Sequence, residues 1–433
     1  MLEIYKNPNV KWILIQGIFS SIGGSILWFS TTWLIYGLGG SNRDLGRILG
    51  LATLIGLVGS LIISGLADRF RRDVLIWLGG LFLLVGSYML ATSENLDDVF
   101  VGQIIVSIGA LSLFPIIVAL FADSIPAENR NKVFGTQFLL SNSASAIGNL
   151  VGYFIFKGMD TEEIASLDVE LIKFSILIAT LTQVIAFSFM LLLKDRNTVS
   201  EAEEGTIASN YIRENKNTRT EFGRNWYKTG IIDRSEFAPG SLQIISLSLV
   251  SAYIIGMGAG ISIPYFPRFF FDIYKIDLAD LSILFAFMTL ITALWGKVNT
   301  NLADRFGRVE LIVANQLISV TLLVLLSTYP PLIFALLTLI VRNAAMNGVG
   351  PVATAIQMEY SPRKYRSKIN ALNMVAWVVL FSVGQMIGGW LVDNYSFRLP
   401  ILITASLYFL STIFYWRIGK VIPFEANNII ESN

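Results

Sequence analysis

Long apolar stretches alternate with short polar segments along the whole chain. A helix needs about 20 mainly apolar residues to cross the hydrocarbon core of a bilayer, and twelve stretches reach that length. They are expected at about 12–37, 45–65, 74–92, 99–122, 133–156, 171–193, 241–271, 281–300, 309–328, 332–358, 369–392 and 399–418. The pattern predicts an all-α membrane protein with twelve transmembrane helices.

One charged segment between apolar stretches occurs twice. The sequence GLADRFRR at residues 65–72 returns 236 positions later as NLADRFGR at residues 301–308. We call these two stretches the hinge segments. Further matches at the same offset are Pro115 with Pro351, Asp123 with Glu359, Arg130 with Arg366, Gly148 with Gly384 and Gly152 with Gly388. Because this register holds without a gap, the chain is interpreted as two copies of one unit.

The repeat divides the chain into two halves and a linker. Residues 1–193 form the expected N-terminal six-helix half, and residues 241–433 form the C-terminal half with a short polar tail. Residues 194–240 are polar throughout and show no apolar period. Such a segment cannot bury enough apolar surface to fold alone, so we expect a solvated cytoplasmic linker.

Composition supports a membrane protein and excludes several kinds of chemistry. Hydrophobic residues make up 54% of the chain and charged residues only 15%, whereas soluble proteins carry about 25% charged residues. A net charge of +1 gives no general attraction to nucleic acid. The absence of cysteine and histidine removes thiolate chemistry and the usual proton shuttle. No cofactor or metal site is expected.

Lys and Arg gather on one side of the predicted topology. Leaving out the linker, sixteen lie on the side of both termini and both hinge segments, and seven lie on the other side. Cytoplasmic loops carry an excess of these residues. The chain is therefore predicted to be a multi-pass plasma-membrane protein with both termini in the cytoplasm.

The two six-span halves, the long linker and the two hinge segments resemble the major facilitator superfamily over essentially the whole chain. The hinge signature of that family is roughly G-x-L-a-D-r-x-G-r. The first copy has Arg71 where the signature has glycine, and the second begins with Asn301. The resemblance implies parallel halves related by an axis along the membrane normal, a central cavity and alternating access.

The resemblance also implies roles for the hinge residues. Asp68 is expected to face the N-terminus of the eleventh span, where the helix dipole favours an anion. Arg72 should reach Asp123 at the foot of the fourth span, and Arg308 should reach Glu359 at the foot of the tenth. These pairs would hold the cytoplasmic side closed in the outward-facing state. The expected gating residues are Asp68, Arg69, Arg72, Asp123, Asp304, Arg305, Arg308 and Glu359.

Features of the fourth and fifth spans bear on the direction of transport. Residues 148–152 resemble the glycine-rich motif of proton-coupled drug exporters, but Asn149 stands where that motif has proline. Small residues four apart also let helices approach closely, and this interpretation is favoured. Gln103 occupies the position where related exporters often carry an arginine. Both departures disfavour proton antiport, so a drug or metabolite exporter working as a proton antiporter is kept only as the alternative.

Polar and adaptable side chains in several spans are candidates for a substrate cavity. Families of this kind line the cavity with spans one, four, seven and ten, and the fifth span adds a polar face. At 100° per residue, suitable side chains fall on one stripe of each helix. The candidates are Gln16, Ser20, Gln103, Gln137, Tyr253 and Met257. Each set would also suit a contact between helices, and we favour that simpler interpretation for each set alone.

Arg342 in the tenth span is the strongest candidate. It lies about 15 Å below the end of its span by helix rise, on one face with Asn343, Met346 and Asn347. A charge at this depth is costly unless it meets water or a partner. One explanation is helix packing, and the other is binding of a substrate carboxylate or phosphate, which an arginine fork suits. Because the sequence places no acid inside the spans, binding is favoured.

The sequence thus predicts a secondary active or facilitative transporter of small organic solutes, with an anionic metabolite as one candidate, working as a monomer in the lipid bilayer. No phosphate-binding loop for ATP is present, and no residue set suggests an enzyme. A membrane sensor on the same fold that binds a ligand without transporting it is the alternative from another class.

Overall fold

The computed structural model describes residues 6–65, 70–126, 129–158, 167–194, 237, 239–362 and 365–421. In this part of the chain, twelve helical segments are long and apolar enough to span a membrane. The helices of the first half are α1 (Pro8–Gly37), α2 (Asn42–Gly65), α3 (Arg72–Ala91), α4 (Leu96–Asp123), α5 (Arg130–Phe156) and α6 (Val169–Met190). The prediction of six spans in this half is confirmed.

The second half repeats this plan, with two of its spans broken. Its helices are α8 (Ser241–Ser262), α9 (Phe266–Tyr274), α10 (Leu278–Phe306), α11 (Arg308–Leu326), α12 (Leu332–Gly348), α13 (Gly350–Glu359), α14 (Arg366–Tyr395) and α15 (Arg398–Val421). The seventh span is interrupted by a 3₁₀ turn that contains Pro264, and the tenth is interrupted just before Pro351. Proline removes a backbone donor and disturbs the preceding turn.

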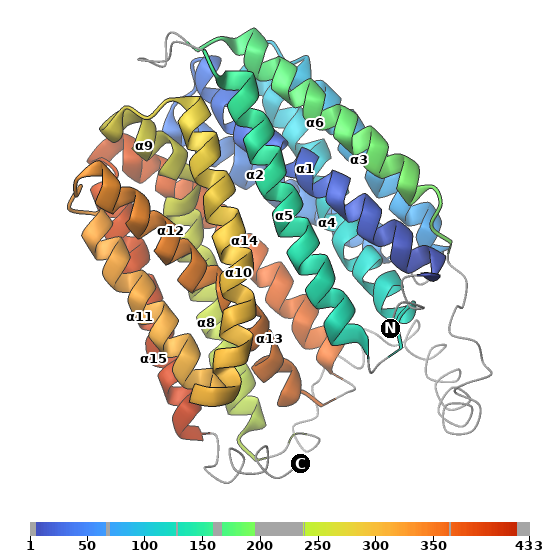
Figure 1. Ribbon diagram of the computed structural model, residues 1–433, viewed down its shortest axis with the longest axis vertical. Helices are drawn as coiled ribbons and strands as arrows, with labels where there is room; N and C mark the ends of the chain where they lie inside the picture. The colour runs from blue at the N-terminus through green and yellow to red at the C-terminus, as the bar shows by residue number, and fades with distance from the viewer. Residues whose placement is uncertain are drawn as a thin grey trace.

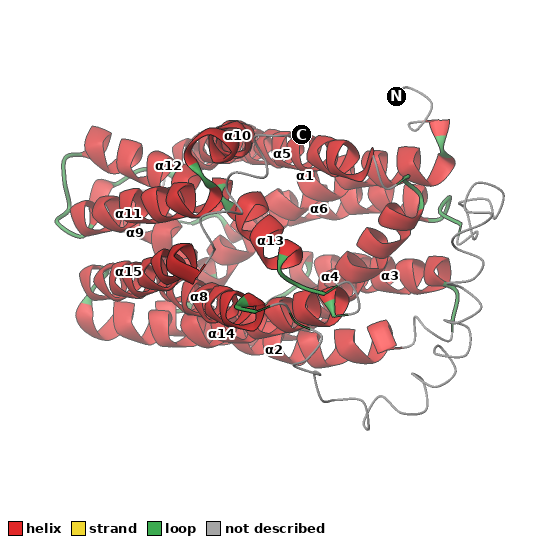
Figure 2. Cartoon of the chain, turned by 90° about the horizontal axis from the view of Figure 1, so that it is seen from below, coloured by secondary structure: helices red, strands yellow, loops and turns green. Residues whose placement is uncertain are grey.

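Two pairs of helices join the halves. Helix α2 packs against α14 on one side of the molecule, and α5 packs against α10 on the other. Figure 2 shows these two pairs at opposite edges of the bundle. Within each half, corresponding helices make corresponding contacts, such as α1 with α6 and α8 with α15. Figure 1 shows the two groups of helices leaning together.

Glycines permit close helix contacts at equivalent places in the two halves. A Cβ atom on Gly148 would overlap the carbonyl oxygen of Ile22, and one on Gly384 would overlap that of Met257. The positions of Gly148 and Gly384 are related by the sequence repeat. The geometry supports helix packing as the role of both glycine-rich segments.

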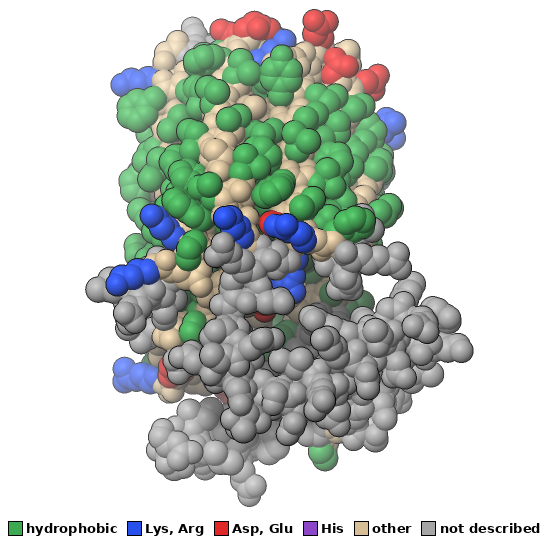
Figure 3. Space-filling model, turned by 90° about the vertical axis from the view of Figure 1, so that its right-hand side faces the viewer, with side chains coloured by type: hydrophobic (Ala, Val, Ile, Leu, Met, Phe, Trp, Pro, Cys, Tyr) green, Lys and Arg blue, Asp and Glu red, His purple; other side chains and the backbone are tan. Residues whose placement is uncertain are grey.

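The outer surface shows how the bundle lies in a bilayer. Figure 3 shows a band of hydrophobic side chains, with Asp, Glu and a few Lys and Arg above it and mainly Lys and Arg along its lower edge. Large apolar residues such as Phe154 and Ile333 are 73% and 69% exposed, which suits contact with lipid. We call the end with the start of α1 and the end of α15 the hinge end, and the opposite end the far end.

Candidate functional site

A pocket lies where the two halves meet. Its volume is about 190 Å³, and its lining residues come from α5 of the first half and from α10 and α12 of the second. These residues are Phe138, Asn142, Thr289, Thr292, Asn343 and Asn347. Five of the six are polar and none is charged, so the pocket offers hydrogen bonds without a fixed charge.

A chain of hydrogen bonds fixes one wall of the pocket. Asn347 Nδ2 donates to Asn343 Oδ1 over 2.8 Å, and Asn343 Nδ2 donates to Thr292 Oγ1 over 2.8 Å. The Thr292 hydroxyl then donates to the carbonyl oxygen of Met288 over 2.7 Å. Because each group is held by the next, these side chains are oriented before a ligand arrives.

The other two polar lining residues are anchored to their own helices. Asn142 Nδ2 donates to the carbonyl oxygen of Phe138 over 2.8 Å, and the Thr289 hydroxyl donates to that of Phe285 over 2.8 Å. An amide side chain has two donor hydrogens and two acceptor lone pairs. Asn142 therefore keeps both donor and acceptor capacity for a ligand.

Arg342 lies away from this pocket. Its side chain is 1% exposed, and Nη2 donates to the hydroxyl of Tyr408 in α15 over 2.9 Å. The guanidinium carbon lies 5.8 Å from the ring centre of Phe266 and 5.4 Å from that of Tyr408. The expectation that Arg342 faces a water-filled cavity is wrong for this conformation, because the aromatic rings of α9 and α15 enclose the cation.

The remaining predicted cavity residues are dispersed. Asn343 and Asn347 line the pocket as expected, whereas Met346 is buried at 8% exposure. Gln16 is buried at 5% exposure, and the Tyr253 hydroxyl donates to the carbonyl oxygen of Leu372 over 3.4 Å. The half-buried residues outside the pocket lining are Ser20, Gln103, Gln137 and Met257.

Sequence reasoning missed four lining residues, Phe138, Asn142, Thr289 and Thr292. Asn142 could have been predicted from the sequence, because burying an amide inside a transmembrane helix is costly unless it has a hydrogen-bond partner. It is adjacent to Ser141, which is on the polar face noted for the fifth span. Thr289 and Thr292 could not be predicted as lining residues, since a threonine hydroxyl can donate its hydrogen bond to a carbonyl of its own helix.

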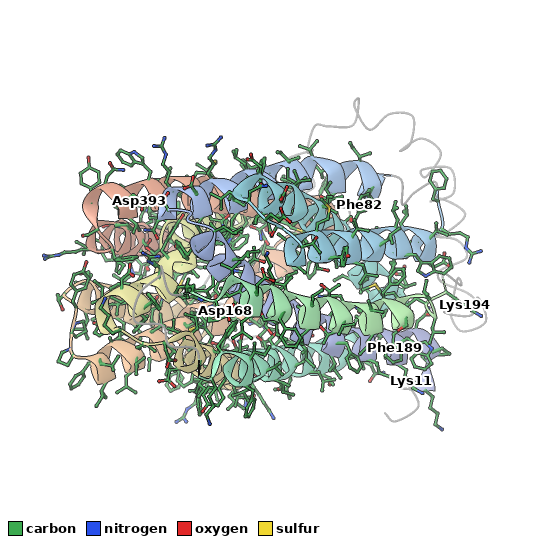
Figure 4. The ribbon with its side chains drawn as sticks, turned by 90° about the horizontal axis from the view of Figure 1, so that it is seen from above. Lys11, Phe82, Asp168, Phe189, Lys194 and Asp393 are labelled. Carbon is green, nitrogen blue, oxygen red and sulfur yellow. The ribbon has the colours of Figure 1, made fainter. Side chains whose placement is uncertain are left out.

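Contacts between the halves close the far end. Asp393 of α14 accepts hydrogen bonds of 2.8 Å from the Asn42 side chain and from the backbone N–H of Arg43, at the start of α2. Figure 4 shows Asp393 on α14 beside α2. We call Asn42, Arg43 and Asp393 the far-end clasp. A carboxylate suits this place because a helix N-terminus carries partial positive charge.

Aromatic side chains extend the far-end contact on α1. The ring centres of Trp33 and Phe271 lie 5.1 Å apart, and those of Trp28 and Phe285 lie 5.7 Å apart. Both tryptophans lie in the last third of α1, and their partners belong to the second half. The two halves are therefore held together near the far end in this conformation.

At the hinge end, the structure repeats one ion pair in each half. Arg72 Nη1 lies 2.5 Å from Asp123 Oδ2, and Arg308 Nη1 lies 2.5 Å from Glu359 Oε2. The predicted partners are confirmed, and each pair joins residues 51 positions apart. Both pairs act within one half, so they brace each half and do not themselves bridge the two.

The structure describes two of the other four predicted gating residues. Asp68 and Arg69 fall outside the described residues. Asp304 and Arg305 are exposed, and the Arg305 guanidinium lies 5.3 Å from the ring centre of Phe306. Their role in closing the cytoplasmic side stays a prediction.

Curated relatives match only part of the chain. The quinolone resistance protein NorA of Staphylococcus aureus is 26% identical over 118 residues, which are 27% of this chain and 30% of NorA. Myo-inositol transporter 3C of Cryptococcus neoformans is 27% identical over 118 residues, which are 27% of this chain and 20% of that protein. The chain thus matches less than a third of the length of each relative.

Solved structures match the fold almost completely. A bacterial homolog of the human lysosomal transporter Spinster, in an inward-facing and occupied conformation, has a TM-score of 0.73 and 14% identity, with 98% of each chain covered. The inward-open xylose transporter XylE of E. coli has a TM-score of 0.69 and 17% identity, with 95% of this chain and 96% of XylE covered.

The family assignment rests on the whole sequence rather than on one motif. The family model described as "Major Facilitator Superfamily" matches residues 13–298 and again residues 248–429. These matches include both hinge segments and both walls of the pocket. The protein belongs to the Major Facilitator Superfamily.

Proposed function

We propose that the protein moves a small solute across the plasma membrane by alternating access, with residues 1–193 rocking against residues 241–433. One observation carries the proposal: the pocket is shared by α5 of the first half and by α10 and α12 of the second. A relative movement of the halves would therefore open and close the pocket itself.

The far-end contacts support a two-state cycle. They combine the exposed carboxylate of Asp393 with aromatic pairs that belong to a buried hydrophobic cluster shared by both halves. Hydrogen bonds exposed to water contribute little net free energy. A carrier needs its two states to lie within a few kcal/mol of each other, and the exposed hydrogen bonds of Asp393 can break at a cost of that order. In the described conformation they favour access to the pocket from the hinge end.

The pocket favours a small solute over a drug-sized one. Sites for drug-sized ligands occupy about 300–1,000 Å³, and this pocket measures about 190 Å³. The similarity to NorA, whose name refers to quinolone resistance, keeps drug export as the second candidate. A membrane sensor would hold its ligand without carrying it across, and the transport measurements below separate that alternative.

The first test follows access to the pocket and needs no known substrate. The natural chain has no cysteine, so a single introduced cysteine reports alone. In proteoliposomes, the variant Phe138→Cys should react with an impermeant thiol reagent from both sides, because a cycling protein exposes the pocket alternately. Cross-linking of cysteines introduced at Asn42 and Asp393 should restrict this reaction to the hinge end.

Phe154→Cys is the matched control, because Phe154 lies on the same helix and its 73% exposed side chain faces outward. Lipid should shield this cysteine from the aqueous reagent on both sides. Reaction of Phe138→Cys from one side only, with or without the far-end cross-link, would contradict alternating access.

A further inference from the structure

We propose that the pocket selects uncharged solutes that carry several hydroxyl groups, that is, small polyols. This inference rests on the proposed transport function and assigns a substrate class to the same pocket. It replaces the anionic substrate expected from Arg342. The argument uses charge, hydrogen-bonding capacity and size.

Charge is the first step. None of the six lining residues is ionisable, so a carboxylate or an ammonium would lose its hydration without gaining a counter-charge. Such a transfer is costly. Arg342, the neighbour of Asn343 in sequence, points to Tyr408 and Phe266 instead of into the pocket. The lining therefore discriminates against ions of either sign.

Hydrogen-bonding capacity is the second step. Asn142 and Asn347 each donate one hydrogen bond to the protein, and each amide has four bonding positions in total. Among the described residues, the Oδ1 atoms of both side chains have no protein partner. The pocket thus presents donors and acceptors together. A hydroxyl group both donates and accepts, so a solute with several hydroxyls satisfies both kinds of group at once.

Size is the third step. A water molecule occupies about 30 Å³ in the liquid, so a pocket of about 190 Å³ has the volume of roughly six waters. Phe138 supplies one apolar wall, against which the C–H face of a ring or a short carbon chain can pack. A compact polyol displaces these waters and replaces their hydrogen bonds.

The test uses three compounds that share the same sugar ring and differ in charge: neutral D-glucose, cationic D-glucosamine and anionic D-glucuronate. Binding to the purified full chain is measured by the shift in melting temperature, because a ligand of the folded state raises that temperature. Transport is measured by counterflow in proteoliposomes. We expect D-glucose to bind at least tenfold more tightly than either charged analogue, and to exchange across the membrane.

Pocket variants make the test specific to these side chains. Asn142→Ala and Asn347→Ala should each weaken D-glucose binding at least tenfold. Asn394→Ala is the matched control and should bind as the parent does, since Asn394 is exposed and donates to its i−4 carbonyl oxygen just as Asn142 does. Asn347→Asp should reverse the preference and bind D-glucosamine more tightly than D-glucose, because it places a negative charge in the pocket.

Each outcome decides one of the two proposals. Binding of D-glucuronate as tight as that of D-glucose, or no binding by any of the three, overturns the polyol assignment. Unchanged D-glucose binding by well-folded Asn142→Ala and Asn347→Ala also overturns it. Binding of D-glucose without counterflow keeps the substrate class and overturns transport. Alternating reaction of Phe138→Cys together with counterflow of D-glucuronate keeps transport and overturns the class.

Discussion

At the scale of single residues, aromatic side chains surround the buried cation of Arg342. Arg342 has a single side-chain partner, the Tyr408 hydroxyl, and its Nε atom has no hydrogen-bond partner among the described residues. Two aromatic faces lie within 6 Å and attract the cation through their ring quadrupoles. Sequence reasoning placed Arg342 inside the tenth span, and α12 contains it. The direction in which its side chain points depends on which helices pack against α12, and the residues near Arg342 in the sequence do not determine that.

We predict that Tyr408→Phe destabilises the protein, because it leaves a buried guanidinium N–H without an acceptor. Leaving such a group unpaired costs about 1–3 kcal/mol. Adding Arg342→Met should recover most of that loss, since removing both partners is nearly neutral when the shape is kept. Melting temperatures of the two single variants and the double variant measure the coupling.

Tyr415→Phe on the same helix is the control, since Tyr415 is also buried and has no side-chain hydrogen bond in the described part of the chain. Equal melting temperatures for Tyr408→Phe and Tyr415→Phe would show that the Arg342–Tyr408 hydrogen bond does not stabilise the protein. If Arg342→Met melts normally but loses solute binding, the substrate role expected from the sequence would be restored.

At the scale of helices, the termini carry the contacts that can change during a cycle. The ion pairs of Arg72 and Arg308 stay within their halves, and their carboxylates are 57% and 51% exposed. Exposed ion pairs contribute only about 0–1 kcal/mol to stability. The far-end clasp, in contrast, joins the halves directly, so its loss affects the balance of states rather than the fold of either half.

We predict that Asp393→Asn opens the far end more often. The change removes the negative charge that the N-terminus of α2 and the Asn42 amide stabilise. At an exposed site we expect a loss of about 1 kcal/mol, or roughly fivefold in the equilibrium between the two states. In a Phe138→Cys background, the rate of thiol reaction from the far side should rise by that factor.

The melting temperature of Asp393→Asn should stay close to that of the parent, since each half keeps its own contacts. Asn394→Ala changes the adjacent residue, which bonds within its own helix, and should leave the reaction rate unchanged. A lower or unchanged rate in Asp393→Asn would show that the clasp does not hold the far end closed.

At the scale of the whole molecule, the sequence repeat predicted the architecture, whereas the pocket is formed by residues far apart in the sequence. The offset of 236 residues predicted two equivalent halves, and the family resemblance predicted the two ion pairs, which have the same spacing in both halves. The pocket could not be predicted this way. Thr292 meets Asn343 from 51 positions away, and Asn142 lies in the other half. Such a site depends on how the halves pack and on the break in the tenth span.

The charge asymmetry of the molecule predicts its orientation in the membrane. Figure 3 shows mainly Lys and Arg at the lower edge of the apolar band, and Asp and Glu with a few Lys and Arg at the upper edge. Cytoplasmic segments retain Lys and Arg, while acids have little influence, so the hinge end should face the cytoplasm. In intact cells, Glu94→Cys at the exposed far end should react with an impermeant thiol reagent, and Asn301→Cys at the hinge end should react only after permeabilisation. The parent protein, which has no cysteine, is the negative control for labelling. The opposite labelling pattern would invert the topology and place the pocket's hinge-end access outside the cell.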